Sequence, residues 1–368
     1  MKLKTVELRR IALPLVRPFR TSFGVQARRD VLLIHLVTDE GEGWGECVAL
    51  THPFYSSEYV EGAHAILRDY LIPRLFAAPE VTATAVAPLL GDVLGHRMAK
   101  AAIETAILDA ELRAHDMSFA SYIGAVRTEV ECGVSVGIAA SIDQLLEEVA
   151  GYVKQGYLRI KLKIEPGWDV EPVRAVRESF GPDLRLQVDA NSAYDAATSV
   201  QLEALDEFSL LLIEQPFAED DLHQHTVLSQ RIRTAVCLDE SITSARVAAD
   251  AIRRGACSVI NVKAGRMGGY LEAVRVHDVC DALGIPVWCG GMLETGIGRA
   301  ANVALAALPN FRYPGDTSAS DRYYEEDITE PFVLRDGKLP VPTGPGMGVQ
   351  PRPDVLQALT TSVETIQS

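Results

Sequence analysis

Hydrophobic positions in the first third of the chain change from an extended pattern to a helical one. Residues 1–20 form a Pro-punctuated extended stretch, and residues 31–49 read as two strands around the polar turn 39–43, which predicts a β-hairpin. Two segments with apolar residues at helical spacing follow. The first can be capped by Ser56 or Ser57, and the second spans residues 96–115. We therefore expect a small α+β unit at this end.

From residue 132 onward, short runs rich in Val, Ile and Leu recur with helical segments between them. Their starts are separated by 26, 26, 26, 25, 23, 27 and 26 residues, which is the length of one βα unit. Eight such units predict parallel strands closed into a barrel. An open doubly wound sheet is the alternative, but the sequence has no G-x-G-x-x-G fingerprint after the first strand. The runs begin at residues 132, 158, 184, 210, 235, 258, 285 and 311.

The predicted fold is α/β, a modified TIM barrel of the (β/α)₇β type with an N-terminal α+β capping domain. The eighth helix is left out because residues 316–332 are polar and irregular. The 368 residues leave room for both parts, since a barrel uses roughly 250. We expect the capping domain over residues 1–125, the barrel over 126–326, and a Pro/Gly-rich segment over 327–368 that packs back on the capping domain.

Composition narrows the classes of partner. With 35 basic and 50 acidic residues the net charge is −15, which argues against nucleic acid and anionic membrane surfaces. No apolar run reaches the roughly 20 residues of a membrane span, and the first 20 residues lack the apolar core of a signal peptide. The six cysteines form no C-x-x-C pair, which favours reduced thiols. We expect a cytoplasmic protein whose partner is a small molecule, with no nucleic acid and no membrane.

Charged residues occupy one matched position in five consecutive predicted units. They are Lys163, Asp189, Glu214, Asp239 and Lys263, spaced 26, 25, 25 and 24 residues apart at the carboxyl ends of their strands. In a barrel this end is the catalytic face. A single acid there could simply cap a helix, but three carboxylates on adjacent strands repel one another and raise each other's pKa. A divalent cation removes that conflict, and oxygen ligands without His or Cys suit Mg²⁺ or Mn²⁺.

The two lysines are predicted on strands two and six, which face each other across a ring of eight. A substrate carboxylate held between them would have one lysine on each side of its α-carbon, which suits transfer of the α-proton. Free lysine, with a pKa of about 10.4, is too basic for this role. We expect Lys161, a bound cation and burial to lower the pKa of Lys163. In the alternative interpretation, the lysines are only ion-pair partners of the three acids.

The motifs at these positions resemble the enolase superfamily, muconate-lactonizing subgroup, in which a Lys or His base works beside Mg²⁺. Longer stretches along the whole chain resemble the o-succinylbenzoate synthase/N-acylamino acid racemase family. The motifs are K-x-K at 161–163, D-x-N at 189–191, E-Q-P at 214–216, D-E-S at 239–241 and K-x-G-R at 263–266.

The resemblance implies that Asp189, Glu214 and Asp239 bind Mg²⁺ and that Lys163 and Lys263 are the acid/base pair. The implied activities are dehydration of 2-succinyl-6-hydroxy-2,4-cyclohexadiene-1-carboxylate to o-succinylbenzoate, for menaquinone synthesis, and racemisation of N-acylamino acids such as N-succinylamino acids. A homo-oligomer is also implied, since similar proteins form octamers. The implied contacts to the substrate, including two residues of a capping-domain lid, are Lys161, Ser135, Asn191, Gly291, Met292, Leu293, Phe23 and Tyr55.

Departures from other branches of the superfamily narrow the choice. Residues 284–296 contain no histidine, unlike members that resemble mandelate racemase. Asp316-Thr317-Ser318 lacks the second acid of the D-x-D that holds a substrate ammonium in dipeptide epimerases. A dipeptide epimerase or muconate cycloisomerase stays as the alternative enzyme, and a catalytically silent metal-binding scaffold barrel as the alternative outside enzymes.

Overall fold

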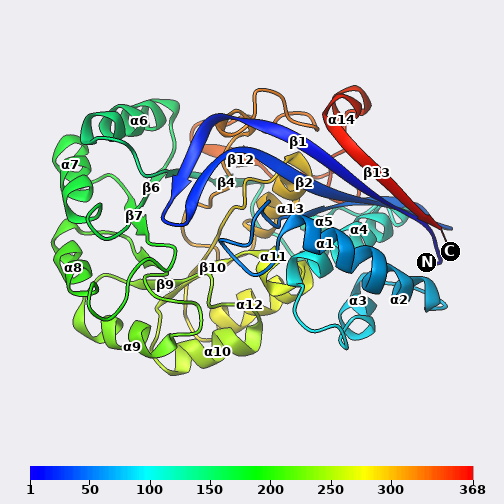
Figure 1. Ribbon diagram of the computed structural model, residues 1–368, viewed down its shortest axis with the longest axis horizontal. Helices are drawn as coiled ribbons and strands as arrows, with labels where there is room; N and C mark the ends of the chain where they lie inside the picture. Colours follow the sequence, from blue (N-terminus) through cyan, green and yellow to red (C-terminus); the bar gives the residue numbers. More distant parts are fainter. Residues whose placement is uncertain (368) are drawn as a thin grey trace.

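A four-stranded antiparallel sheet, in the order β13-β1-β2-β3, forms the base of the capping domain. The computed structural model describes residues 1–367. Figure 1 shows β1 and β2 as a long blue ribbon over the mouth of the barrel, with the red β13 beside β1. The predicted hairpin is present, because β2 pairs antiparallel with β3 from Leu32↔Cys47 to Val37↔Glu42. The strands are β1 (Leu3–Thr21), β2 (Gly24–Thr38), β3 (Glu42–Cys47) and β13 (Thr360–Gln367).

One long helix, α4 (Arg97–Ala114), packs on this sheet and is buried around most of its circumference, as its apolar pattern predicts. The sheet approaches the helix backbone closely. A Cβ at Gly45 would lie 2.1 Å from the carbonyl oxygen of Ala102, so only glycine fits there. The remaining helices of this domain are α1 (Val60–Ile66), the π-helical turn η1 (Leu67–Leu71), α2 (Ile72–Ala77), α3 (Ala83–Leu89) and α5 (Phe119–Ile123).

The first helix begins later than the sequence suggested. Its N-cap is Tyr59 rather than Ser56 or Ser57. The hydroxyl of Ser56 instead closes a local turn, accepting from the backbone N–H of Glu58 at 3.2 Å. A serine that satisfies backbone groups in a turn competes with helix formation, which explains the delayed start.

Seven parallel strands follow one another in chain order and form the barrel wall. The eighth predicted strand, residues 311–316, is not a regular strand. It makes isolated bridges, Val287↔Phe311 on one side and Cys132↔Gly315 on the other, and so joins the two edges of the sheet. Pro314 lies within it and has no N–H to give to a ladder. The strands are β5 (Gly133–Val136), β6 (Arg159–Lys163), β7 (Leu186–Asp189), β8 (Ile213–Glu214), β9 (Val236–Leu238), β10 (Val259–Val262) and β11 (Val287–Cys289).

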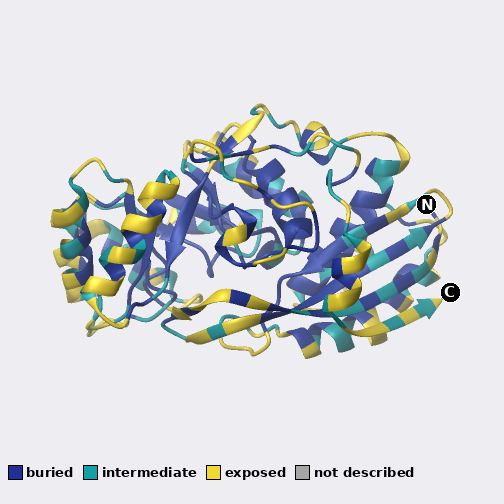
Figure 2. Cartoon of the chain, turned by 90° about the horizontal axis from the view of Figure 1, so that it is seen from above, coloured by how far each residue is buried: buried dark blue, intermediate teal, exposed yellow. Residues whose placement is uncertain are grey.

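Helices surround the strands, and most of them follow the outer edge of the molecule in Figure 1. Figure 2 shows the strands buried and the outer faces of the helices exposed. Residues 316–332 contain only a short 3₁₀ turn, η3 (Ser320–Arg322), which agrees with the omission of an eighth helix. The others are α6 (Ile142–Gln155), α7 (Val170–Phe180), α8 (Val200–Glu203), η2 (Ala204–Phe208), α9 (Leu222–Arg231), α10 (Ala245–Arg253), α11 (Ala264–Met267), α12 (Tyr270–Ala282) and α13 (Gly296–Leu305).

The last part of the chain contacts both units. β12 (Lys338–Pro340) pairs with β4 (Glu129–Glu131), and α14 (Pro353–Leu359) leads into β13, which pairs with β1 of the capping sheet. Over residues 1–367, none of the helices combines the length and the apolar character needed to cross a membrane.

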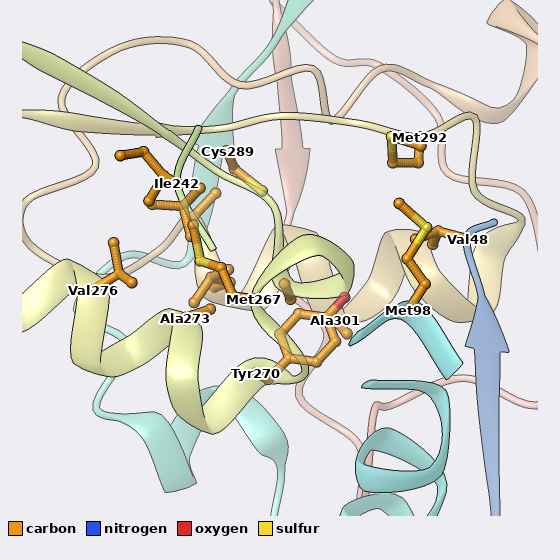
Figure 3. Close-up of a cluster of buried hydrophobic side chains, with 14 of the residues drawn as sticks. Val48, Met98, Ile242, Met267, Tyr270, Ala273, Val276, Cys289, Met292 and Ala301 are labelled. Atoms are coloured by element: carbon orange, nitrogen blue, oxygen red, sulfur yellow. The ribbon is translucent and has the colours of Figure 1, made fainter. Parts of the chain in front are cut away.

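A continuous hydrophobic core joins the capping domain to the barrel. Figure 3 shows Val48 and Met98, from the capping side, in one buried cluster with Met267 and Met292 of the barrel. The contact is close at Gly265, where a Cβ would lie 2.3 Å from Cγ2 of Val48. Burial of this apolar surface holds the capping sheet over the carboxyl ends of the barrel strands.

Candidate active site

The five charged residues predicted at strand ends all lie at the same end of the barrel. Lys163, Asp189 and Glu214 are the last residues of β6, β7 and β8. Asp239 and Lys263 directly follow β9 and β10. All five are buried. Parallel strands bring equivalent positions to one edge of a sheet, so the matched spacing placed them together.

Lysine and carboxylate groups alternate within this site. Lys163 Nζ lies 2.7 Å from Asp189 Oδ2, and Lys263 Nζ lies 2.6 Å from Asp239 Oδ2. Lys161 Nζ lies 3.2 Å from Asp189 Oδ2 and 3.1 Å from Glu214 Oε2. These ion pairs match the alternative interpretation, in which the lysines balance the charge of the three acids.

Burial and neighbouring charges shift the pKa values of two of the acids in opposite directions. Burial, together with the charge of Asp189, raises the pKa of Glu214 to about 8. Burial also acts on Asp189, but the nearby ammonium groups of Lys163 and Lys161 outweigh it and lower the pKa of that carboxyl. The same site therefore holds one acid that is easily protonated and one that is kept ionised.

Two of the lysines are strongly affected by the neighbouring carboxylates. Burial acts to lower the pKa of Lys263, but the carboxylate of Asp239 outweighs it, and the pKa is raised. Lys161 behaves in the same way, because Asp316, Glu214 and Asp189 surround its ammonium group. The ammonium of Lys161 lies 2.7–3.2 Å from oxygens of these three carboxylates.

The donor set fits a hard divalent cation. Asp189, Glu214 and Asp239 offer only carboxylate oxygens, the ligands preferred by Mg²⁺ and Mn²⁺. Oδ1 of Asp239 is buried without a hydrogen-bond partner, so one ligand atom is not used by the protein. As the side chains stand in residues 1–367, no three acid, imidazole or thiol groups are grouped closely enough to hold a metal. The ammonium groups of Lys161 and Lys263 lie against the carboxylates, and they would have to turn aside for a cation.

A cavity of about 490 Å³, including its open mouth, lies between the barrel and the capping domain. Every residue predicted to contact substrate lines it. The lysines of the expected acid/base pair line it from β6 and from the end of β10. These lining residues are Phe23, Tyr55, Ser135, Lys161, Asn191, Gly291, Met292, Leu293, Lys163 and Lys263.

Six further residues that were not among the predicted substrate contacts line the cavity, and two of them, Phe19 and Thr21, belong to the stretch 19–24 that was expected to form part of the lid. Asp316 had a signal, because it ends the eighth run at the spacing of the other charged positions. Gln26 faces the cavity because the β1–β2 pairing sets it opposite Phe19. Tyr323 comes from an irregular segment and had no periodic signal. The six are Phe19, Thr21, Gln26, Leu50, Asp316 and Tyr323.

Asp316 joins the charged groups from the opposite side. Its Oδ2 lies 2.7 Å from Nζ of Lys161, and its Oδ1 accepts from Nη1 of Arg159 at 2.8 Å. The ring of Trp288 lies 4.7 Å from the same ammonium, within cation–π range. Lys161 is thereby held in position at the centre of the barrel mouth.

Asn191 links the acids through an unusual backbone conformation. Its φ is 43°, in the left-handed region. The side-chain oxygen accepts from Lys163 Nζ at 2.6 Å, and the side-chain nitrogen donates to Glu240 at 3.0 Å. Such a conformation is held by its surroundings and is frequent at functional sites.

The capping domain closes the cavity with aromatic side chains. Tyr55 donates to Asp239 Oδ2 at 3.1 Å, and its ring centroid lies 5.7 Å from that of Phe23. Near Phe23, Ser22 donates to the carbonyl of Ala190 at 3.3 Å. Two loops of the capping domain thus contact the strand ends and can exclude water from the site.

The fold and the site together define a capped barrel whose strand ends carry a buried cluster of lysines and carboxylates beside a cavity. Two family models match the chain: "Mandelate racemase / muconate lactonizing enzyme, N-terminal domain" over residues 4–124 and "Enolase C-terminal domain-like" over residues 144–355. The chain belongs to the enolase superfamily, in the branch of mandelate racemase and muconate lactonizing enzyme. Membership implies binding of a divalent metal.

Similar proteins cover nearly the whole chain. An N-succinylamino acid racemase of Amycolatopsis sp is 66% identical over 98% of this chain and 98% of its own. An o-succinylbenzoate synthase of Geobacillus kaustophilus is 45% identical over 95% of this chain and 93% of its own. The crystal structure of an enolase-superfamily member from Listeria innocua is 41% identical, with a TM-score of 0.95 over 100% of this chain and 99% of that one.

Proposed function

We propose that this enzyme uses Mg²⁺ and a pair of lysines to remove the α-proton of a carboxylate, both as an N-succinylamino acid racemase and as an o-succinylbenzoate synthase. One observation carries the proposal: Lys163 and Lys263, which come from strands four positions apart, line a single cavity with three carboxylates between their strands. The names of the similar proteins supply the substrates. When bound, Mg²⁺ would stabilise the negative charge that develops on the substrate carboxylate.

In the racemase reaction, the lysines act on opposite faces of the α-carbon. One lysine, as the free amine, takes the α-proton, and the other, as the ammonium, returns a proton to the other face. The two lysines exchange roles for the opposite enantiomer, so the reaction needs both. Lys161 would hold the substrate carboxylate, and Tyr55 and Phe23 would close the cavity over the acyl group.

The synthase reaction needs one acid/base lysine. Lys163 would take the α-proton of the cyclohexadiene carboxylate, and the electron pair of that C–H bond would form the new ring double bond. The β-hydroxyl would leave with the proton from Lys163 as water, so that the ring becomes aromatic. Lys263 would stay protonated and face the ring as a cation. The synthases among the similar proteins, 40% to 45% identical to this chain, support this second activity.

The alternative of a dipeptide epimerase is disfavoured by the surroundings of Asp316. In that reaction an acid at this strand would meet a substrate ammonium, but here Asp316 is already bound by Arg159 and Lys161. Its two neighbours, Thr317 and Ser318, carry no charge. An acylated substrate without an ammonium group suits the cavity better.

Deuterium exchange tests the proposal. The protein is incubated with one enantiomer of an N-succinylamino acid and Mg²⁺ in D₂O, and the α-proton and the optical rotation are followed. We expect α-deuterium with inversion. Absence of exchange with every N-acylamino acid at saturating metal contradicts the racemase activity. A silent scaffold predicts no exchange with any carboxylate, and conversion of the cyclohexadiene substrate is measured separately by absorbance of the aromatic product.

We further propose that the chain divides into a capping domain over residues 1–125, a barrel over 126–326 and a C-terminal segment over 327–368. We also propose that the protein forms a homo-oligomer, which light scattering can test, and that it is located in the cytoplasm. All six cysteines are free and buried, which supports a reducing compartment.

A further inference from the structure

A carboxylate of the capping domain reaches into the barrel at a point outside the charged site. Glu46 lies on β3 and is 6% exposed. Both of its oxygens accept from the backbone N–H of Thr295 at 3.1 Å, and Oε2 also accepts from the hydroxyl of Thr295 at 2.6 Å and from the N–H of Gly298 at 3.1 Å. Within residues 1–367, Glu46 takes part in no ion pair.

These donors belong to the first turn of α13, of which Thr295 is the N-cap. The first N–H groups of a helix have no partner within the helix. Here Glu46 of the capping domain is one acceptor for these groups. Asp327 is a second acceptor, for the N–H of Gly296 at 2.8 Å. The packing is close at Gly298, where a Cβ would lie 2.9 Å from Cγ of Glu294 and 3.0 Å from Oε2 of Glu46. The start of α13 is thus anchored by two segments that are distant in sequence.

The anchored turn directly follows a segment that lines the substrate cavity, Gly291 to Leu293. Leu293 has a φ of 59°, a left-handed conformation that a leucine keeps only when its neighbours hold it. On one side its carbonyl accepts from the hydroxyl of Tyr324. On the other side, two residues further along the chain, the hydrogen bonds from Thr295 to Glu46 fix the backbone. The position of the cavity wall therefore depends on a side chain of the capping domain.

We propose that Glu46 is a positioning residue that holds the Gly291–Leu293 wall in the conformation that binds substrate. The capping domain then contributes to the site in two ways. Its loops close over the substrate, and Glu46 on β3 fixes the Gly291–Leu293 wall of the barrel. Because the wall contacts the substrate and not the transferred proton, loss of Glu46 acts equally on the ground state and the transition state. Such a change raises KM and leaves kcat nearly unchanged.

The test compares Glu46→Gln with Glu42→Gln, the same substitution on the same strand at a half-exposed position. We expect Glu46→Gln to raise KM for an N-succinylamino acid by about tenfold or more, with kcat within about threefold, and Glu42→Gln to change neither. A lower melting temperature with unchanged KM assigns Glu46 a structural role only and overturns the proposal. A fall in kcat at constant KM also overturns it.

A second variant tests the same contact in case Glu46→Gln does not fold. Thr295→Val removes the hydroxyl donor at nearly constant volume and should raise KM in the same direction, and the double variant should be no worse than the worse single one. Additive effects would show that the two side chains act independently and would contradict the proposal.

Amide hydrogen exchange provides a readout that needs no activity. The amides of Thr295 and Gly298 should exchange faster in Glu46→Gln than in the parent, while amides of β10 should not change. Unchanged exchange at both amides overturns the anchoring role. The KM measurement rests on the proposed racemase function. If that function is wrong, the parent protein itself is inactive, and this outcome is distinct from a failure of the role proposed for Glu46.

Discussion

The phenol oxygen of Tyr55, from the capping domain, lies 2.9 Å from Nζ of Lys263, at the end of a barrel strand. The same hydroxyl donates to Asp239 Oδ2 at 3.1 Å, and the tyrosine ring lies 4.9 Å from the ammonium. A residue of the capping domain thus touches both a lysine of the proposed acid/base pair and an acid of the expected metal set. Closure of the lid and arrangement of the charged groups are therefore connected through one side chain.

Replacement of Tyr55 by phenylalanine tests this connection. Tyr55→Phe keeps the ring over Lys263 but removes both hydrogen bonds, each of which has a charged partner and is worth about 1.5–3 kcal/mol. We expect kcat/KM for racemisation to fall at least about tenfold, a loss of about 1.4 kcal/mol or more. Tyr70→Phe, at a half-exposed tyrosine, is the control. Unchanged kinetics in Tyr55→Phe would mean that the hydroxyl is not used during turnover.

Removal of one lysine separates exchange from inversion. In Lys263→Ala, Lys163 can still take a proton from one face of the α-carbon, but no second lysine can return it to the other face. We expect racemisation to be lost, while α-deuterium exchange persists for one enantiomer without inversion. The measurement is NMR of each enantiomer in D₂O, with the exposed Lys154→Ala as control. Retained racemisation in Lys263→Ala refutes the two-base mechanism.

Metal affinity tests the role of Asp239. Asp239→Asn keeps the shape of the side chain but removes the negative charge that a hard divalent cation prefers. We expect Mg²⁺ to bind at least about tenfold more weakly, a difference of about 1.4 kcal/mol, in titration calorimetry. The control is Asp354→Asn, whose side chain is 78% exposed. An unchanged affinity removes Asp239 from the ligand set.

The charged residues at the strand ends could be predicted from the sequence because their placement depends only on the regular spacing of the βα units. Parallel strands with helical crossovers carry equivalent residues to one edge, so the spacing from Lys163 to Lys263 was sufficient to place five charged groups together. Most elements of the barrel follow from the same repeat. The interpretation as a proton-transfer site then needed only the chemistry of carboxylates and lysines.

Features that depend on side-chain contacts between distant segments could not be predicted in this way. Gln26 reaches the cavity because a register shift between Pro14 and Phe19 sets the pairing of β1 with β2. Burial acts to lower the pKa of Lys263, but the charge of Asp239, on the neighbouring strand end, outweighs it and the pKa is raised. The segment 311–316 bridges its neighbours without forming a regular strand, since a proline interrupts its pairing. Spacing along the chain contains none of this information.

Asp316 is expected to be a major source of stability as well as a site residue. It balances two buried cations, Arg159 and Lys161, and removal of one partner from a buried ion pair costs about 3–5 kcal/mol. Asp316→Asn should therefore lower the free energy of unfolding by about 3 kcal/mol in a urea titration. Glu131→Gln, which removes the exposed pair with Arg185, should change it by less than about 1 kcal/mol. Equal effects of the two substitutions would contradict the buried pairing.

The pH dependence of stability is expected to reveal Glu46. Burial raises its pKa from 4.5 to about 7, the charge of Glu294 adds to this rise, and the Thr295 hydroxyl and the charge of Arg29 oppose it. Because the folded pKa exceeds the unfolded value, the folded protein binds more protons than the unfolded chain between these two values. Stability from this group is therefore greatest below pH 4.5 and declines as the pH rises through about 7.

This shift in the pKa of Glu46 changes its contribution to the free energy of unfolding by on the order of 3 kcal/mol between the unfolded and folded pKa values. Glu46→Gln cannot titrate, so the stability difference between parent and variant should change by this amount between pH 4.5 and 7.5, in favour of the parent at the lower pH. Urea unfolding at several pH values measures it, and the comparison cancels the other buried acids, including Glu104. If the two stability curves stay parallel over this range, the Glu46 carboxyl titrates at its ordinary pKa. The anchoring of α13 would then be made by a carboxylate that is half ionised at pH 4.5 and almost fully ionised at the upper end of the window.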